Sequence, residues 1–479
     1  GVAAQQAGQL TAGDVDDGLN FDHFLTFKDR SYTALAKKEQ QIPSPNLRDR
    51  VAVLVTDSQG SPFSCAVVEA CCTSAGAAVE LPTGTDGRLS VFPAFDGLQG
   101  QLVLRAKVYG ATCSGQAAGQ SCSVDQEVDF GTVGSNSSVV SIAVPAASSL
   151  PNKLDVTFAV DTTGSMGDEL TYLQKELLAI LNSVQSSNAG ADVRAGLVLY
   201  KDHGDEYLVQ TTPLGPVSAG SGAVAALTGA SASGGGDYPE ALAEAMEAAV
   251  ALDWRKGNVA RVLFLAADAP PHSEKFGRAL AAAKQARTKG VKVYGLAASG
   301  VGDSAEYLMR LVSAVTGARY TWLTDDSGIG GAHAEPKVLC YQVTRLDALI
   351  RRILRSELTG QRVEATEGEV LREVGRQEAG VCIVDLTTTT TTPTTTHTSS
   401  TADAGATTSA ATTSAAGDGS PLPGGEVSVP GSDDGAGSTD ALSGSALSGE
   451  MMLSSAALPG LSRALALLCA LLVGLWPLA

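Results

Sequence analysis

The chain has 479 residues, of which 44% are apolar and 18% charged, so its length and composition allow two or three domains with sizeable cores. Its 51 acidic residues outnumber 33 basic ones, which gives a net charge of −18 at pH 7. This balance argues against a nucleic-acid partner and favours cations or basic partners. The chain starts at Gly1, which indicates either a removed signal peptide or an N-terminally incomplete sequence.

The first 150 residues divide into two predicted segments. Residues 1–46 show no sustained hydrophobic period and are predicted to be a leader segment. Residues 47–150 carry short alternating apolar runs separated by turn sequences such as DSQGSP and PTGTDG, which predict an all-β sandwich domain. The sequences VLVTDSQGSP and TDGRLSVFP resemble the carboxypeptidase-regulatory or transthyretin-like sandwich domains.

Cysteines are concentrated in this predicted sandwich. Five of the eight lie between Cys65 and Cys122. This density predicts disulfide bonds in an oxidising compartment, although the spacing does not determine the pairing. Reduced cysteines, buried as small apolar side chains, are the alternative.

Residues 151–361 are predicted to form a doubly wound, Rossmann-like α/β domain. The runs VTFAV, AGLVLY, VLFLA and VKVYGLA are continuously apolar, which is typical of parallel strands covered on both faces. Between these runs, apolar residues such as Leu170, Leu173 and Leu177 recur at helical spacing. A similar pattern from Leu346 to Leu354 predicts the last helix of the domain.

Polar residues follow the first of these apolar runs at a position suited to ligand binding. Asp161 ends the run, and Thr163 and Ser165 follow it at alternate positions. In an open parallel sheet, ligands bind outside the carboxyl ends of the strands. One carboxylate and two hydroxyls form an all-oxygen ligand set, which suits Mg²⁺, with Mn²⁺ or Ca²⁺ as alternatives. A helix-capping turn is the alternative interpretation of these three residues alone.

The segment DVTFAVDTTGSM resembles the first strand and loop of the von Willebrand factor A-type domain, with its metal-ion-dependent adhesion site. The segments GLVLYKDHGDEY, ASGGGDYPEAL and RVLFLAADAPPH support this resemblance, which extends from about Leu154 to about Leu358. It implies that Asp161, Thr163 and Ser165 hold a divalent cation. It also implies that Asp268 contacts this cation directly or through water. An open coordination position would then accept an acidic residue of a protein partner.

The second loop departs from the family pattern. The family usually offers a threonine there, whereas this chain has glycines and Asp237. Asp237 is interpreted either as a fifth metal ligand, directly or through water, or as the cap of a helix that starts at Tyr238 and Pro239.

Other polar residues near the site receive structural interpretations. We predict that four residues belong to a loop between strands: Asp202, His203, Asp205 and Glu206. A second cation site at these residues is the less favoured alternative. His272 follows two prolines and is expected to shape its loop rather than bind metal, because oxygen ligands dominate the predicted site.

The remaining chain is predicted to lead to a membrane. Residues 362–386 are interpreted as a connecting segment, and residues 387–453 as a disordered Ser/Thr-rich stalk of a composition that is often O-glycosylated. Residues 454–479 combine small residues, a short spacer and the apolar run ALALLCALLVGLWPLA, which matches a GPI-attachment signal. A single membrane span is the alternative. Either anchor predicts a location on the extracellular side of the cell surface.

These features predict a cell-surface adhesion or protein-ligand-binding protein rather than an enzyme. No G-x-S-x-G, H-E-x-x-H or P-loop motif occurs in the sequence. An accessory subunit of a membrane channel or receptor complex is the main alternative, and a metal-dependent hydrolase is the less favoured one. The expected partners are an acidic protein ligand at the metal site and the membrane at the anchor, with no nucleic acid.

Overall fold

The computed structural model describes residues 10–38, 41–72, 78–108, 122–127, 139–187, 190–217, 220, 222–328 and 332–383. All of them belong to a compact unit, Gly1–Thr392, and Pro393–Ala479 form a second unit. The predicted stalk and anchor segment lie outside the described residues. No helix among the described residues combines the length and apolarity needed to span a bilayer.

In the described part of the chain, the largest sheet has nine strands in the order β11-β10-β9-β12-β13-β14-β1-β15-β16. Its parallel centre consists of β9 (Lys153–Asp161), β10 (Asp192–Tyr200), β12 (Ala260–Ala267), β13 (Lys292–Ala297) and β14 (Tyr320–Thr324). Four of these strands contain the apolar runs that predicted them. Antiparallel pairing adds β1 (Thr11–Val15), β11 (Val209–Pro216), β15 (Tyr341–Arg345) and β16 (Arg372–Val374), so the sheet is mixed.

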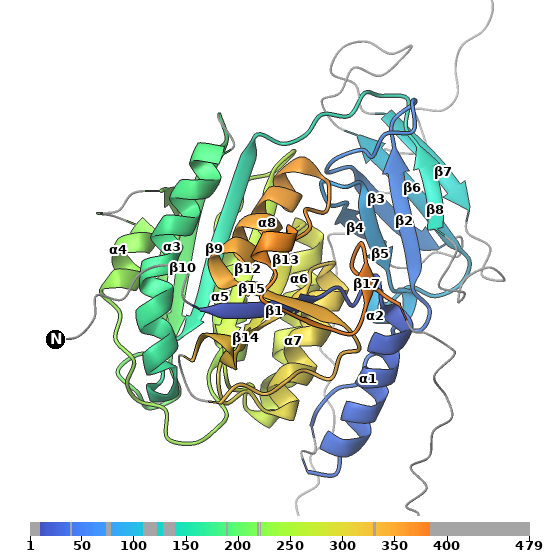
Figure 1. Ribbon diagram of the computed structural model, residues 1–479. Coiled ribbons are helices and arrows are strands. Elements are labelled where there is room, and N and C mark those ends of the chain that lie inside the picture. The colour runs from blue at the N-terminus through green and yellow to red at the C-terminus, as the bar shows by residue number, and fades with distance from the viewer. Residues whose placement is uncertain are drawn as a thin grey trace, which may run out of the picture. The chain divides into compact units, whose positions relative to one another are not determined.

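Helices cover both faces of this sheet (Figure 1). One core contains residues of α3 (Gly167–Ser187), α4 (Gly222–Thr228) and α8 (Leu346–Thr359). The other contains residues of α1 (Phe21–Leu35), α5 (Leu242–Ala251), α6 (Phe276–Lys289) and α7 (Asp303–Thr316). Along β9, Phe158 and Val160 belong to the first core and Ala159 to the second, because successive side chains of a strand point to opposite faces. The predicted doubly wound α/β class is therefore confirmed.

The expectation that residues 1–46 form a leader segment is wrong. β1 lies between β14 and β15 in the main sheet, and α1 packs against α7 (Figure 1). Gly13 of β1 allows this close packing, because a Cβ there would lie 2.6 Å from the Trp322 ring. Asp17 pairs with Arg310 of α7 at 2.7 Å, and the Arg310 guanidinium lies 3.7 Å from the centroid of the Phe27 ring. The N-terminal segment is thus part of the α/β domain.

Residues 362–386 also do more than connect two segments. β16 pairs with β15, and β17 (Gln377–Glu378) forms a short hairpin with β18 (Val381–Cys382). A disulfide bond joins Cys382 to Cys340, next to the start of β15. Four short 3₁₀ turns complete the described helical segments of this domain: η1 (Gly164–Met166), η2 (Ser273–Lys275), η3 (Asp325–Ser327) and η4 (Glu367–Glu369).

The predicted β-rich region precedes β9 and has two sheets. The first contains β5 (Arg88–Val91), β2 (Val51–Thr56) and β8 (Val139–Ala143), and the second contains β4 (Val79–Pro82), β3 (Val67–Cys72), β6 (Leu102–Val108) and β7 (Cys122–Glu127). A single-turn helix, α2 (Pro93–Asp96), follows β5. Buried and partly buried residues alternate along β2 and β6, and strands of both sheets contribute to one core. The resemblance to carboxypeptidase-regulatory or transthyretin-like domains stays a prediction.

The cysteines of this region correct part of the disulfide prediction. Cys65, Cys71 and Cys72 are free thiols, as in the alternative interpretation, but they are only partly buried. Cys113 and the side chain of Cys122 lie outside the described residues.

Candidate metal centre

The candidate site lies at the carboxyl edge of the parallel strands. β9 pairs in parallel with both β10 and β12, so the loops that follow these strands meet at one edge of the sheet. Asp161 is the last residue of β9, and Asp268 directly follows β12. A cleft of about 570 Å³ opens between these loops, with Thr163, Ser165 and Asp268 in its lining.

Hydrogen bonds join three of the predicted ligands, Asp161, Thr163 and Ser165. The backbone N–H and the hydroxyl of Thr163 donate to Asp161 Oδ1 at 2.9 and 2.8 Å. The Thr163 and Ser165 hydroxyl oxygens are 3.3 Å apart, and Ser165 and Asp268 line the same cleft. The structure therefore brings together the four residues predicted from the strand ends. Their role as metal ligands stays a prediction.

Buried acid groups at this edge lack compensating charge. Among the described residues, Asp161 Oδ2, Asp268 Oδ1 and Glu240 Oε2 are buried without a hydrogen-bond partner. Burial, and secondly the negative charge of Asp268, raise the pKa of Asp161 to about 7. Burial also raises the pKa of Asp268. Buried polar atoms are normally satisfied, so these oxygens and the two neighbouring hydroxyls fit a hard divalent cation.

Glu240 is the residue that the sequence analysis missed. Its side chain lies in the lining of the cleft, and its backbone N–H donates to the Pro270 carbonyl at 2.9 Å, which ties it to the Asp268 loop. Burial, and secondly the charge of Asp161, raise the pKa of Glu240 to about 9. The available signal was a second acid in the loop that departs from the family pattern, three positions after Asp237.

Asp237 lies in the lining of the same cleft but is exposed. Its interpretation as a helix cap is wrong, because α5 begins at Leu242 rather than at Tyr238. The structure thus leaves Asp237 at the mouth of the cleft, and its interpretation as a fifth ligand stays a prediction.

The glycines beside Asp237 explain why no threonine occupies the second loop. Gly234 and Gly235 have φ angles of +80° and +83°, which side-chain-bearing residues rarely adopt. A Cβ on Gly234 would lie 2.3 Å from Asp205 Oδ1, and one on Gly235 would lie 3.0 Å from Glu240 Oε1. The Gly235 N–H donates to Asp205 Oδ2 at 2.8 Å. The loop therefore packs closely against Asp205 and Glu240. It presents backbone groups rather than a hydroxyl group to the cleft.

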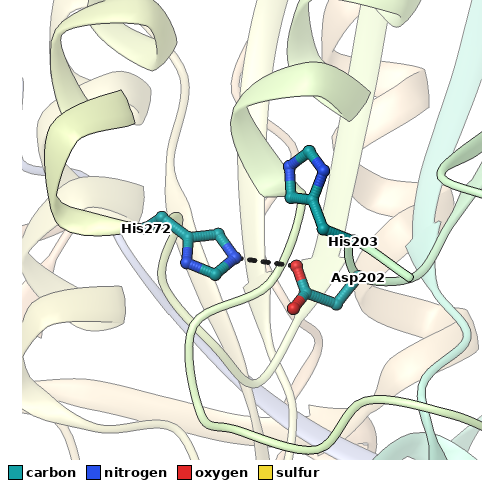
Figure 2. Close-up of side chains that lie close together, drawn as sticks. All are labelled: Asp202, His203 and His272. Carbon is teal, nitrogen blue, oxygen red and sulfur yellow. Dashed lines mark hydrogen bonds and ion pairs between the residues drawn. The ribbon is translucent and has the colours of Figure 1, made fainter. Parts of the chain in front are cut away.

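The loop after β10 is partly structural, as expected. Asp205 accepts hydrogen bonds from the backbone N–H groups of Gly235 and Asp202, which lower its pKa. Glu206 is exposed. His272 does more than shape its own loop, because its Nε2 lies 2.8 Å from Asp202 Oδ1 (Figure 2).

Comparison with known proteins places this geometry in a family. Residues 155–328 match the family model of the von Willebrand factor type A domain. This part of the chain is a von Willebrand factor type A domain. The match includes Asp161, Thr163, Ser165 and Asp268 within its bounds.

Individual relatives are more distant. A protein of Acanthamoeba polyphaga mimivirus, named as an ariadne-like RING finger protein, is 34% identical over 125 residues, or 26% of this chain. This chain spans only 12% of the length of that relative. The solved structure of BatB from Bacteroides thetaiotaomicron is similar at 18% identity and a TM-score of 0.23, over 30% of this chain and 66% of that one. The open pilus adhesin SpaC of Lactobacillus rhamnosus GG matches at 13% identity and a TM-score of 0.31, over 54% and 32%.

Proposed function

We propose that this von Willebrand factor type A domain binds a protein partner through a divalent cation, with Mg²⁺ the expected ion and Mn²⁺ or Ca²⁺ the alternatives. The proposed ligands are Asp161, Thr163, Ser165 and Asp268. The supporting observation is the set of buried carboxylate oxygens without partners at a single cleft. The family match supports a protein-interaction role, which is compatible with a protein that is not an enzyme.

The charge of the proposed site favours an acidic partner. Thr163 already occupies Asp161 Oδ1, so Oδ2 is the atom available to the ion. When Asp268 contacts the ion through water, Asp161 supplies one direct carboxylate and the two hydroxyls are neutral, so the divalent ion keeps a net positive charge. A coordination position open to the cleft then attracts a further oxygen anion, such as an Asp or Glu carboxylate of a partner.

Glu240 takes the place of the missing threonine in this proposal. In the metal-free protein its pKa is raised to about 9, so its carboxyl group is protonated at neutral pH, and we propose that it keeps this proton beside the ion and offers a neutral carbonyl oxygen. A neutral ligand preserves the attraction of the ion for an acidic partner, as a threonine hydroxyl would. Asp237, exposed at the mouth of the cleft, would reach the ion through water.

Crystals soaked in Mn²⁺ test the site directly. We expect an anomalous peak between the loops that carry Asp161 and Asp268, and no peak there in crystals of Asp161→Asn. A map without the peak in the wild-type protein would overturn the assignment.

A binding assay tests the partner chemistry. Beads coated with the full chain should retain peptides that contain Asp or Glu in the presence of Mg²⁺, and should release them when the ion is chelated. Matched peptides with Asn or Gln are the control, because they lack the anionic oxygen. Equal retention of both peptide sets would contradict recognition through the cation.

We also propose that the chain acts at the extracellular side of a membrane, as a cell-surface adhesion or ligand-binding protein. The Cys340–Cys382 disulfide supports an oxidising compartment. The proposed GPI attachment depends on residues 454–479, outside the described part of the chain. Release from cells by a phosphatidylinositol-specific phospholipase is the expected result, and retention would favour a membrane span.

A further inference from the structure

A second group of potential metal ligands lies outside the all-oxygen site. Asp202 and His203 belong to the loop after β10, and His272 belongs to the loop after β12. One ligand atom from each residue lies within 4.8 Å of those of the other two. The His203 and His272 rings are 5.6 Å apart between centroids, and Figure 2 shows both rings beside the Asp202 carboxylate. Residues that are 70 positions apart in the chain thus converge on one point.

A carboxylate lies close to each imidazole ring of this cluster. The Asp202 side chain is only 7% exposed, and His272 Nε2 is 2.8 Å from its Oδ1. Glu244 Oε1 lies 3.7 Å from His203 Nε2 and accepts from the Arg278 guanidinium at 2.8 Å, and Glu244 Oε2 is buried without a partner among the described residues. A buried carboxylate, two imidazoles and a second carboxylate oxygen therefore lie within a small volume.

The Lys275 ammonium already lies where a cation would be held. It contacts His203 Nε2 and is 3.1 Å from Glu244 Oε1. An ammonium group has no lone pair, so the lone pair of His203 Nε2 must accept in this contact. The same lone pair is the one that binds a metal ion. Lys275 can keep its contact with Glu244 when a metal takes its place at His203.

We propose that Asp202, His203 and His272 form a second divalent-cation site, one that takes Zn²⁺ or a similar borderline ion. Two imidazole nitrogens and one carboxylate are a common zinc ligand set, and they leave a position for water. This donor set differs from the all-oxygen set of the first site, which favours Mg²⁺. The two sites therefore select different ions at the same edge of the sheet.

The second site would link the loops that build the first. The Asp202 N–H donates to Asp205 Oδ2 at 3.0 Å, and the same oxygen accepts from Gly235 in the second loop. His272 lies four residues after Asp268. A metal ion bound by Asp202 and His272 holds the Asp268 loop against the glycine loop. Zinc should thus raise the melting temperature of the protein by mass action.

Calorimetric titration of the full chain with Zn²⁺, in excess Mg²⁺, tests the proposal. The Asp161→Asn variant should bind Zn²⁺ as wild type does, because it lacks only a ligand of the first site. His272→Ala and His203→Ala should each weaken Zn²⁺ binding by about 10- to 100-fold or more. His23→Ala, an exposed histidine on α1, is the matched control and should have no effect. Lys275→Met should tighten binding several-fold, because it removes the competing cation.

The outcomes distinguish this proposal from the proposed function. Unchanged Zn²⁺ affinity in both His272→Ala and His203→Ala would overturn the second site. Loss of Zn²⁺ binding in Asp161→Asn alone would assign the zinc to the first site and would equally overturn it. His272→Gln, with the same melting temperature as wild type before metal is added, guards against a folding defect. Mg²⁺ binding to the histidine variants should persist, so failure of the second site leaves the first untouched.

Discussion

The two ends of β9 carry acids that are equally buried but differ in their hydrogen-bond and ion-pair partners. Asp155, near the start of the strand, and Asp161, at its end, are both 0% exposed. Arg194 donates to both oxygens of Asp155, at 3.0 and 2.7 Å. Arg255 adds its side chain at 2.7 Å and its backbone N–H at 2.8 Å. Asp161 instead receives only hydrogen bonds from Thr163 at Oδ1, and its Oδ2 has no partner within the described chain.

This difference supports the proposal that Asp161, unlike Asp155, is a metal ligand. The protein balances the charge of Asp155 with two arginines from neighbouring elements. At Asp161, the neighbouring titratable groups include two further acids, Asp268 and Glu240, and the charge of Asp268 helps to raise the pKa of Asp161. Burial alone does not identify a metal ligand. At Asp161, an unpartnered oxygen, two neighbouring hydroxyls and a second acid together support the proposed metal site.

The largest expected effect is on stability, at the compensated end. Asp155→Ala leaves Arg194 and Arg255 partly buried without their carboxylate, and breaking a buried ion pair in this way is worth about 3–5 kcal/mol. Denaturation by urea should show this loss. Asp192→Ala, which removes the 58% exposed partner of Arg255, is the control and should lower stability by less than about 1 kcal/mol. Equal losses of stability in the two variants would mean that burial does not strengthen the ion pairs of Asp155.

Asp161→Asn should show the reverse behaviour. Mg²⁺ affinity should fall by about 100-fold or more, since even groups that only orient a ligand are worth 10- to 100-fold. Without metal, the free energy of unfolding should stay the same or rise, because the change removes repulsion with Asp268. Calorimetry and urea denaturation measure the two quantities. The control is Asp168→Asn, an exposed acid in the lining of the same cleft. A similar loss of Mg²⁺ affinity in this control would mean that the negative charge of the cleft attracts the ion without specific ligands.

Protons should compete with the cation at Asp161. The pKa of Asp161 is raised from 3.8 to about 7, so the folded protein holds a proton that the unfolded chain releases between these values. The metal-free protein should therefore lose stability as the pH rises from about 4 to about 7. Over the same interval Mg²⁺ affinity should rise, by up to about tenfold per pH unit. Titrations at several pH values check both slopes, and Asp161→Asn should reduce them, with the remaining slope due to Asp268 and Glu240, whose pKa values are also raised. A rise in the stability of the metal-free protein over this pH interval would contradict the predicted direction of the change.

The sequence predicted what depends on local pattern and missed what depends on the path of the loops. Asp161 and Asp268 follow continuous apolar runs, and the parallel arrangement of those runs is enough to place the two acids at one edge. No local pattern shows that Asp202 meets His272, because that contact requires two loops to fold toward each other. The burial of β1 is equally non-local, since its neighbour β14 lies some 300 residues away. Its five residues, TAGDV, carry little hydrophobic signal of their own.

The smallest expected effects concern the second loop. Variants of this loop test whether Glu240 differs from Asp161 at the end of β9. If Glu240 offers a neutral oxygen, Glu240→Gln preserves that oxygen and should keep Mg²⁺ affinity within a few-fold of wild type. Glu240→Ala removes the oxygen and should lower the affinity by about tenfold, as expected for one weak ligand. Asp237→Asn, at the exposed mouth of the cleft, should lower it by less. If Gln and Ala were equally damaging at position 240, the carboxylate charge would be the active feature. Glu240 would then resemble Asp161 rather than a threonine, and the ion would hold too little positive charge to attract an acidic partner.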